Sequence, residues 1–364
     1  MKLKAFAVIA ALTAALLLPA CGQKNAPEKP AAATEAQTQA APETASATEA
    51  PTLPTAGETA NPLTGQPGYD AGRLAQKAVG IVVENTPAAR PQWGMTTPDM
   101  VVEYEVEGGI SRMLWLYADL SRVPENVGPV RSARHDVAEL ARGWDLLFVH
   151  CGGSPEALAL IKTYGGALSE IDAMTDGSFT HRDETRDVSL EHRLVLTGTK
   201  LADAVAAHGI DMTADPAKRL PFSFAQAPRA LTGGTAETLH FAYSAAYIND
   251  FTLQAESGKY LREVGSAPMT DENGTVCLYD NVLVLYVEMQ SRNDEAGHQD
   301  LLLENGGEGL YVSGGKCEAI RWAKDGEDAP LRLLTPDGQP LTLNPGVSYL
   351  GLVRSTQKSL TTFG

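Results

Sequence analysis

One short stretch of the sequence gathers residue types that bind anions. Residues 128–157 read GPVRSARHDVAELARGWDLLFVHCGGSPEA, with Arg131 and Arg134 on either side of Ser132. An arginine can hold a carboxylate or a phosphate through two parallel N–H bonds. His150 ends the apolar run of this stretch. These residue types together predict an anion site.

Two helices are expected to begin within this stretch. Val137, Leu140 and Ala141 recur at helical spacing, which predicts a helix that starts near Ser132. A serine at position 154 followed by proline is typical of a second helix start. Because a helix start carries unpaired backbone N–H groups and a partial positive charge, both starts favour an anion.

A buried strand is expected to lead into the second helix. The run WDLLFVH is short and apolar and ends at His150, as buried strands do. In open α/β sheets, ligands lie beyond the carboxyl ends of the strands. With a right-handed crossover, Arg131, Arg134, His150, Ser132 and Ser154 would converge at that end.

A purely structural interpretation stays open beside this one. The two serines would then be N-caps only, each worth about 1 kcal/mol. Arg131 would pair with an acid such as Glu105 or Glu107, and His150 would be a hydrogen-bonded histidine at an edge. Arg134 in the first helical turn opposes the helix dipole, unless an acid such as Glu107 pairs with it.

Nucleophilic catalysis and metal binding fit the sequence less well. His150 and Cys151 are neighbours on one strand, so their side chains point to opposite faces and the imidazole cannot readily activate the thiol. Ser154 lacks a GxSxG elbow, and the glycines before it form no phosphate loop. The spacings within residues 181–187 match no metal motif. We therefore expect no metal and no cofactor, and an enzyme is the weaker interpretation.

The chain opens like a lipoprotein precursor. Residues 1–20 combine two lysines, an apolar core too short to span a membrane, and small residues before Cys21. They predict a signal peptide over 1–20 and lipidation of Cys21. Residues 22–60 are rich in Ala, Thr, Glu, Gln and Pro, which predicts a disordered tether after the lipidated cysteine. The protein is expected to be extracytoplasmic and anchored to the cell membrane by lipid.

Composition narrows the range of partners. The net charge is −16, and loss of Lys2 and Lys4 with the signal peptide makes it −18. Such a chain repels nucleic acid and anionic headgroups, so we expect no nucleic-acid partner and membrane contact through the anchor. The cysteines at 151, 277 and 317 support neither a dense disulfide framework nor a zinc site. Whether Cys277 pairs with Cys317 stays open.

The rest of the chain divides by its expected elements. Strand and helix patterns alternate over residues 61–211, which indicates an α/β domain. Residues 212–236 are polar and rich in proline and form the candidate linker. Residues 237–354 carry apolar runs between turn dipeptides, with no clear helix after Ala245, which indicates a β-rich domain. The predicted fold class is α+β, a layered α/β N-terminal domain followed by a β-rich C-terminal domain.

The sequence resembles one known family in a series of blocks. The blocks are NPLTGQP, VVENTPAARPQWGM, PDMVVEYEVEGGISRML, PENVGPVRSAR, FVHCGGSPEAL and the run from Gly315 to Val353. Over about Asn61 to Val353 they resemble the YerB-like lipoprotein family of Gram-positive bacteria, a family of unknown function. The resemblance implies a lipid-anchored extracytoplasmic protein with an N-terminal and a C-terminal domain, and no established reaction.

The resemblance also carries individual residues. Cys151 stands where the family usually has alanine, which disfavours a cysteine nucleophile. The family's Tyr-Arg-Asp block falls at residues 181–183, where Arg182 and Asp183 carry over but His181 does not. The resemblance implies a candidate ligand surface made of residues that match the family's blocks. These residues are Asn85, Arg90, Pro91, Glu107, Gly108, Gly109, Arg112, Arg131, Ser132, Arg134, His150, Ser154, Trp322, Lys324 and Asn344.

Binding is favoured over catalysis as the function. We expect a lipid-anchored binding or scaffold lipoprotein that recognises an anionic envelope ligand or a membrane protein. The alternative is a cell-wall hydrolase or transferase with Glu107 or His150 as base, although glycoside hydrolysis needs two placed carboxylates. A third, structural role would use the β-rich domain as a docking face. The candidate ligand-binding residues are Glu107, Arg112, Arg131, Ser132, Arg134, His150 and Ser154.

Overall fold

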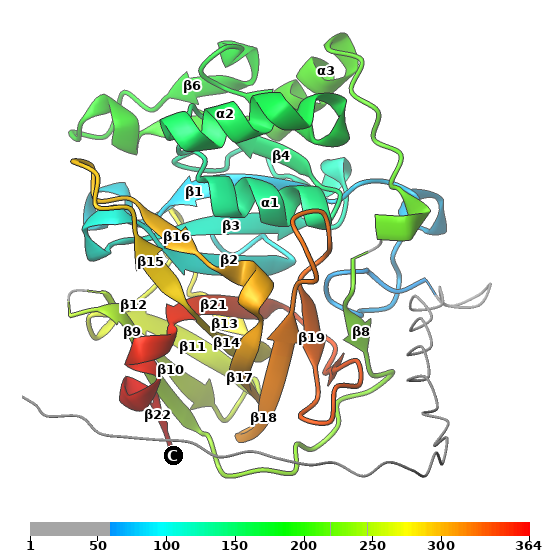
Figure 1. The fold of residues 1–364 in the computed structure, drawn as a ribbon, viewed down its shortest axis with the longest axis vertical. Coiled ribbons are helices and arrows are strands. Elements are labelled where there is room, and N and C mark those ends of the chain that lie inside the picture. Colours follow the sequence, from blue (N-terminus) through cyan, green and yellow to red (C-terminus); the bar gives the residue numbers. More distant parts are fainter. Residues whose placement is uncertain (1–58, 219, 246) are drawn as a thin grey trace, which may run out of the picture. The chain divides into compact units, whose positions relative to one another are not determined.

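The computed structural model describes residues 59–218, 220–245 and 247–364. The expected signal peptide, Cys21 and the tether up to residue 58 lie outside these ranges. Within these ranges, none of the helices combines the length and the apolar character that crossing a membrane requires. Strands dominate and helices are few (Figure 1), so the predicted mixture of sheet and helix is confirmed.

Strands from both halves of the sequence form one ten-stranded sheet. In spatial order its strands are β19 (Arg332–Leu334), β18 (Lys316–Ala323), β17 (Gly307–Ser313), β14 (Asn281–Val287), β21 (Ser348–Arg354), β2 (Met100–Glu105), β3 (Ser111–Tyr117), β1 (Val79–Glu84), β4 (Leu147–His150) and β5 (Ser169–Asp172). The halves meet where β2 and β21 run parallel, with Met100 opposite Ser348 and Tyr104 opposite Leu352.

Seven strands of this sheet point in the same direction. β1 is parallel to β4 and β4 to β5, while β21 is parallel to both β2 and β14. β1 and β2 are both antiparallel to β3, and β14 and β18 are both antiparallel to β17, which places all seven strands in one orientation. Their carboxyl ends share one edge of the sheet, which we call the carboxyl edge. Five of these strands end there at Glu84, Glu105, His150, Asp172 and Arg354.

A second sheet covers one face of the large sheet. Phe241, Phe251 and Tyr349 pack together in the core between the two sheets. The strands of the second sheet are β12 (Ala267–Pro268), β11 (Lys259–Val264), β10 (Tyr247–Gln254), β9 (Thr238–Ser244), β22 (Thr362–Phe363) and β13 (Leu278–Tyr279). The described residues also form the pairs β15 (Met289–Ser291) with β16 (Gln299–Leu301), β20 (Thr342–Leu343) with β8 (Ser223–Phe224), and β6 (Thr180–Arg182) with β7 (Leu194–Leu196).

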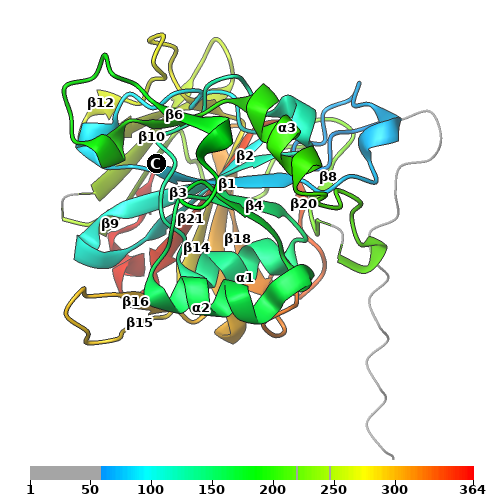
Figure 2. The ribbon, with the colours of Figure 1, turned by 90° about the horizontal axis from the view of Figure 1, so that it is seen from above.

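Two neighbouring helices, α1 (His135–Gly143) and α2 (Pro155–Tyr164), lie on the opposite face (Figure 2). Val137 of α1 and Phe148 of β4 meet in the core on that side. A third helix, α3 (Gly198–Ala207), joins the core on the side of the second sheet.

The described 3₁₀ turns are η1 (Ala71–Arg73), η2 (Pro87–Ala89), η3 (Glu107–Gly109), η4 (Leu120–Arg122), η5 (Gly165–Ala167), η6 (Gly177–Phe179), η7 (Leu190–His192), η8 (Pro216–Lys218), η9 (Leu303–Asn305) and η10 (Ser355–Leu360).

The structure describes three regions about which the sequence raised questions: the residues after Ala245, residues 212–236, and the cysteines at 277 and 317. After Ala245 the described residues form strands and 3₁₀ turns, with no α-helix. Within residues 212–236, Phe222 and Leu231 are buried in the core. Cys277 and Cys317 are both buried and free, so they do not form the disulfide that the sequence leaves open.

Candidate functional site

The starts of α1 and α2 lie side by side at the carboxyl edge. The segment before α1 pairs with the segment after β4. In this pairing the Cys151 N–H donates to the Arg131 carbonyl at 3.0 Å, and the Ala133 N–H donates to the Gly152 carbonyl at 2.9 Å. The Ser154 N–H returns a bond to the Ala133 carbonyl at 3.2 Å. This pairing fixes the position of one helix start against the other.

Ser132 does not cap α1, contrary to its expected role. The N-cap residue is Arg134, in extended geometry, and no side chain caps the first turn. The Ser132 carbonyl instead accepts a bond from the Arg112 guanidinium at 2.8 Å. The expected cap was wrong because pairing with the segment after β4 keeps residues 131–133 extended.

His150 and Ser154 are built into the framework of the edge. The Ser154 hydroxyl accepts the Ala157 N–H at 3.2 Å and caps α2, as the sequence predicts. The His150 ring is fully buried, with Nε2 at 2.9 Å from a Glu170 oxygen and Nδ1 at 2.8 Å from the Gly152 carbonyl. Both ring nitrogens are engaged, so His150 presents no free base.

Two of the edge arginines are paired with glutamates. Arg134 Nε donates to Glu107 at 3.0 Å, and a second N–H completes a bidentate pair. Arg131 Nε lies 3.4 Å from Glu84. The expected partners of Arg131, Glu105 or Glu107, were wrong because residue 131 bonds along β1, the strand that ends at Glu84.

Arg112 is the third arginine, and its charge is poorly matched. It lies on β3 opposite Tyr104 and is only 5% exposed. Among the described residues, Glu107 alone places a carboxylate within 4.0 Å of its guanidinium. Burial, and then the charge of Arg134, lower the pKa of Arg112 to about 10. Because Arg112, Arg131 and Arg134 share two glutamates, one buried positive charge is left over.

A buried hydroxyl lies among these charges. Tyr104 Oη is buried and has no hydrogen-bond partner in the described part of the chain. Burial raises the pKa of Tyr104 to about 12, although the nearby Arg112 and Arg134 act to lower it. The hydroxyl is therefore a neutral group with a hydrogen to donate. We call Glu84, Tyr104, Glu107, Arg112, Arg131 and Arg134 the arginine cluster.

Glu107 lies on the short turn between β2 and β3. Gly108 and Gly109 follow it with φ of 73° and 68°, a region that favours glycine. Burial raises the pKa of Glu107, but the bond to Arg134, the charges of Arg134 and Arg112 and a backbone hydrogen bond together lower it by more, so the pKa lies below its usual value. Glu107 is thus a charged ion-pair partner at neutral pH, which does not suit a general base.

Several residues that carry over from the family resemblance are internal instead of on the surface. The Asn85 amide donates to the Glu103 carboxylate at 3.0 Å in the core between the sheets. The Lys324 ammonium donates to two backbone carbonyls and is buried. Trp322 and Asn344 are buried as well. These four positions stabilise the fold and do not form a ligand surface.

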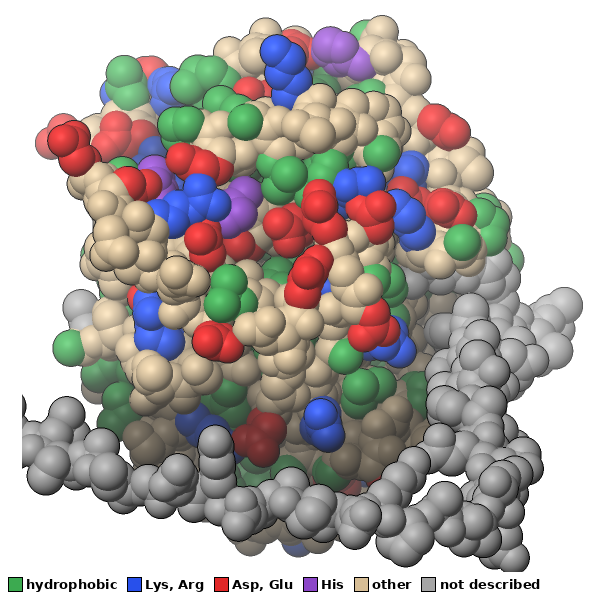
Figure 3. All heavy atoms as spheres, viewed as in Figure 1, with side chains coloured by type: hydrophobic (Ala, Val, Ile, Leu, Met, Phe, Trp, Pro, Cys, Tyr) green, Lys and Arg blue, Asp and Glu red, His purple; other side chains and the backbone are tan. Residues whose placement is uncertain are grey.

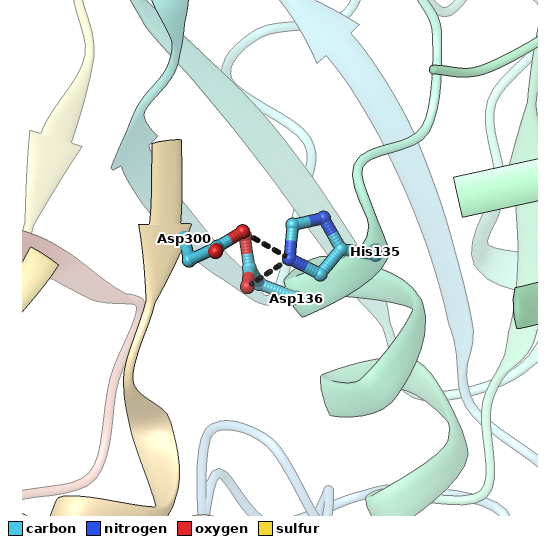
Figure 4. A group of neighbouring side chains, drawn as sticks. All are labelled: His135, Asp136 and Asp300. Carbon is cyan, nitrogen blue, oxygen red and sulfur yellow. Dashed lines mark ion pairs between the residues drawn. The ribbon is translucent and has the colours of Figure 1, made fainter. Parts of the chain in front are cut away.

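A second charged cluster has no counterpart in the sequence analysis. The β15–β16 hairpin reaches the start of α1, where Asp300 lies 2.9 Å from the His135 ring (Figure 4). Figure 3 shows histidine, basic and acidic side chains gathered on the face that carries this hairpin. No motif could reveal this cluster, because Asp300 lies far along the chain from His135. The described His, Asp and Glu groups with closely spaced ligand atoms are His135–Asp136–Asp300, His150–Glu170–Asp172 and Glu156–Asp294–His298.

Two domains of one family match the chain. Residues 63–211 match the N-terminal domain of a family described as a protein of unknown function, DUF3048. Residues 238–350 match the C-terminal domain of the same family. The chain therefore belongs to this two-domain family.

The chain is also similar to YerB of Bacillus subtilis strain 168, a protein provisionally named a lipoprotein. The two sequences are 28% identical over 281 residues, which cover 76% of this chain and 81% of YerB. The crystal structure of YerB matches with a TM-score of 0.72 at 26% identity, over 84% of this chain and 100% of the YerB chain. The resemblance to the YerB-like family is confirmed.

Proposed function

We propose that this protein is a lipid-anchored, extracytoplasmic binding protein whose arginine cluster holds an anionic group of an envelope ligand. The observation that carries the proposal is Arg112, a buried guanidinium that shares its nearest carboxylate with Arg134. A buried charge without a matched partner is costly. A ligand anion would supply the missing negative charge.

In this proposal the ligand anion takes the place of the Glu107 carboxylate. The glycine pair after Glu107 lets its side chain swing away, and Arg112 and Arg134 then donate to the ligand. The start of α1, directly after Arg134, has no side-chain cap, which favours negative charge there. Phosphate and carboxylate groups both suit paired arginine N–H donors.

Lipid anchoring rests on the N-terminal sequence and on the name of the relative YerB. Replacing Cys21→Ser removes the residue that would carry the lipid. We expect this variant to move from the membrane to the soluble extracytoplasmic fraction in washes without detergent. Retention of the variant on membranes would contradict the anchor.

Inorganic phosphate is the probe that tests the arginine cluster. The melting temperature is compared in phosphate and in chloride at equal ionic strength. We expect Glu107→Gln to enlarge the stabilisation by phosphate, because it frees the arginines, and Arg112→Gln to remove it. Arg321→Gln removes the same charge at an exposed position of β18 and serves as the control. An equal phosphate effect in all four proteins would place phosphate elsewhere and contradict the proposal.

A further inference from the structure

The β15–β16 hairpin is tied to the start of α1 by charged side chains. The Leu301 N–H donates to Asp136 Oδ1 at 3.2 Å, and Asp300 beside it reaches the His135 ring (Figure 4). The three polar side chains come from two distant segments and converge on one point. We propose that His135, Asp136 and Asp300 bind a divalent transition-metal ion such as Zn²⁺.

The first support is that one ring nitrogen faces too many partners. His135 Nε2 lies 2.9 Å from an Asp136 oxygen and 2.9 Å from an Asp300 oxygen. Arg292 Nη2 lies 3.1 Å from the same nitrogen. An imidazole nitrogen carries one hydrogen or one lone pair, so it cannot bond well to two carboxylates and a guanidinium together. A metal ion between the nitrogen and the two oxygens would satisfy all three ligands.

The second support is the spacing of the ligand atoms. Zinc bonds to histidine nitrogen and carboxylate oxygen at about 2.0–2.2 Å, which holds neighbouring ligand atoms roughly 3 Å apart. The two nitrogen–oxygen distances of 2.9 Å match that spacing. The Asp136 side chain is only 4% exposed and that of His135 12%, so two of the ligands are already fixed by packing.

Arg292 has to give way for the ion to enter. Its guanidinium bonds to Asp300 and also lies 3.7 Å from Glu156 of α2. A turn toward Glu156 would keep Arg292 paired while it releases the ring nitrogen.

One nitrogen and two carboxylate ligands favour zinc or a similar transition metal over Ca²⁺ or Mg²⁺, which prefer oxygen ligands alone. Three protein ligands leave at least one position open to water or to a ligand.

Zinc titration of the metal-stripped protein tests this site. Calorimetry is expected to show one Zn²⁺ per chain, and Co²⁺ is expected to give visible absorption bands from a bound, nitrogen-ligated ion. Asp300→Asn, on the hairpin, is expected to weaken zinc binding at least tenfold. His135→Gln is a second variant with the same expected loss, and melting curves without metal verify that both variants are folded.

The control variant is Asp294→Asn, which alters the neighbouring group at the hairpin tip. It is expected to keep zinc affinity within threefold of wild type. The proposal is overturned if folded wild type binds no zinc, or if Asp300→Asn binds zinc as tightly as wild type. The proposed anion function is independent of this site, so Arg112→Gln is expected to bind zinc like wild type.

Discussion

Arg262 and Arg112 are both buried, but only Arg262 has a carboxylate partner of its own. Arg262 pairs with Glu103, and both side chains are 0% exposed. Its Nε also donates to Asn249 at 2.9 Å, while Glu103 accepts the Tyr349 hydroxyl at 2.7 Å. Arg112 donates to a backbone carbonyl, and the one described carboxylate near it lies 4.0 Å away and belongs to another pair.

The difference shows that burial of a charge does not by itself indicate a functional site. Burial lowers the pKa of Arg262, but the Glu103 carboxylate together with Tyr349, Tyr279 and Cys277 raises it by more, so the pKa lies above its usual value. The pKa of Arg112 is lowered instead, by burial and by the charge of Arg134. The matched pair joins the two sheets, whereas the unmatched arginine is the one that we propose holds the anion.

The largest effect is expected from breaking the matched pair. Arg262→Met leaves the Glu103 carboxylate in the core without a counter-charge, which should cost about 3–5 kcal/mol of unfolding free energy. Urea denaturation measures this loss. The double variant Arg262→Met with Glu103→Gln removes the stranded charge and should recover part of it. A loss below about 1 kcal/mol in the single variant would mean that the pair is not important for stability.

An intermediate effect is expected at Arg134. Arg134→Met removes the bidentate partner of Glu107, whose side chain is 24% exposed, so the expected cost is about 1–3 kcal/mol at pH 7. Although burial raises the pKa of Glu107, the bond to Arg134 contributes to a net lowering. The stabilisation is therefore present above about pH 4.5 and lost as the pH falls further. Unfolding at pH 7 and pH 3 checks this, and a pH-independent difference would contradict it.

How far the sequence predicts this molecule depends on the range of the interactions. Helical spacing and a local cap were sufficient for α2 and its N-cap Ser154. The prediction that Ser132 caps α1 is wrong, because residues 131–133 pair with the segment after β4. Local sequence patterns do not reveal a pairing between segments so far apart. The Arg131–Glu84 pair and the approach of Asp300 to His135 are likewise contacts between distant segments. The candidate arginines could be named from the sequence, but not the charge balance that distinguishes Arg112.

The smallest effect on stability is expected at Arg112. In chloride buffer, Arg112→Gln loses the bond to the Ser132 carbonyl but also relieves repulsion from Arg134. The two changes should nearly cancel, to within about 1 kcal/mol. Urea denaturation in phosphate-free buffer measures this. A loss as large as that expected for Arg262→Met would mean that Arg112 is a structural residue like Arg262.

Isothermal titration of wild type and Arg112→Gln with inorganic phosphate, at constant ionic strength, tests the central claim most directly. We expect saturable binding of one phosphate per chain in wild type, at least tenfold weaker binding in Arg112→Gln, and unchanged binding in Arg321→Gln. A tenfold loss corresponds to about 1.4 kcal/mol of binding free energy. Phosphate affinity that is the same in wild type and Arg112→Gln, or no saturable binding to folded wild type, would contradict an anion site at the arginine cluster.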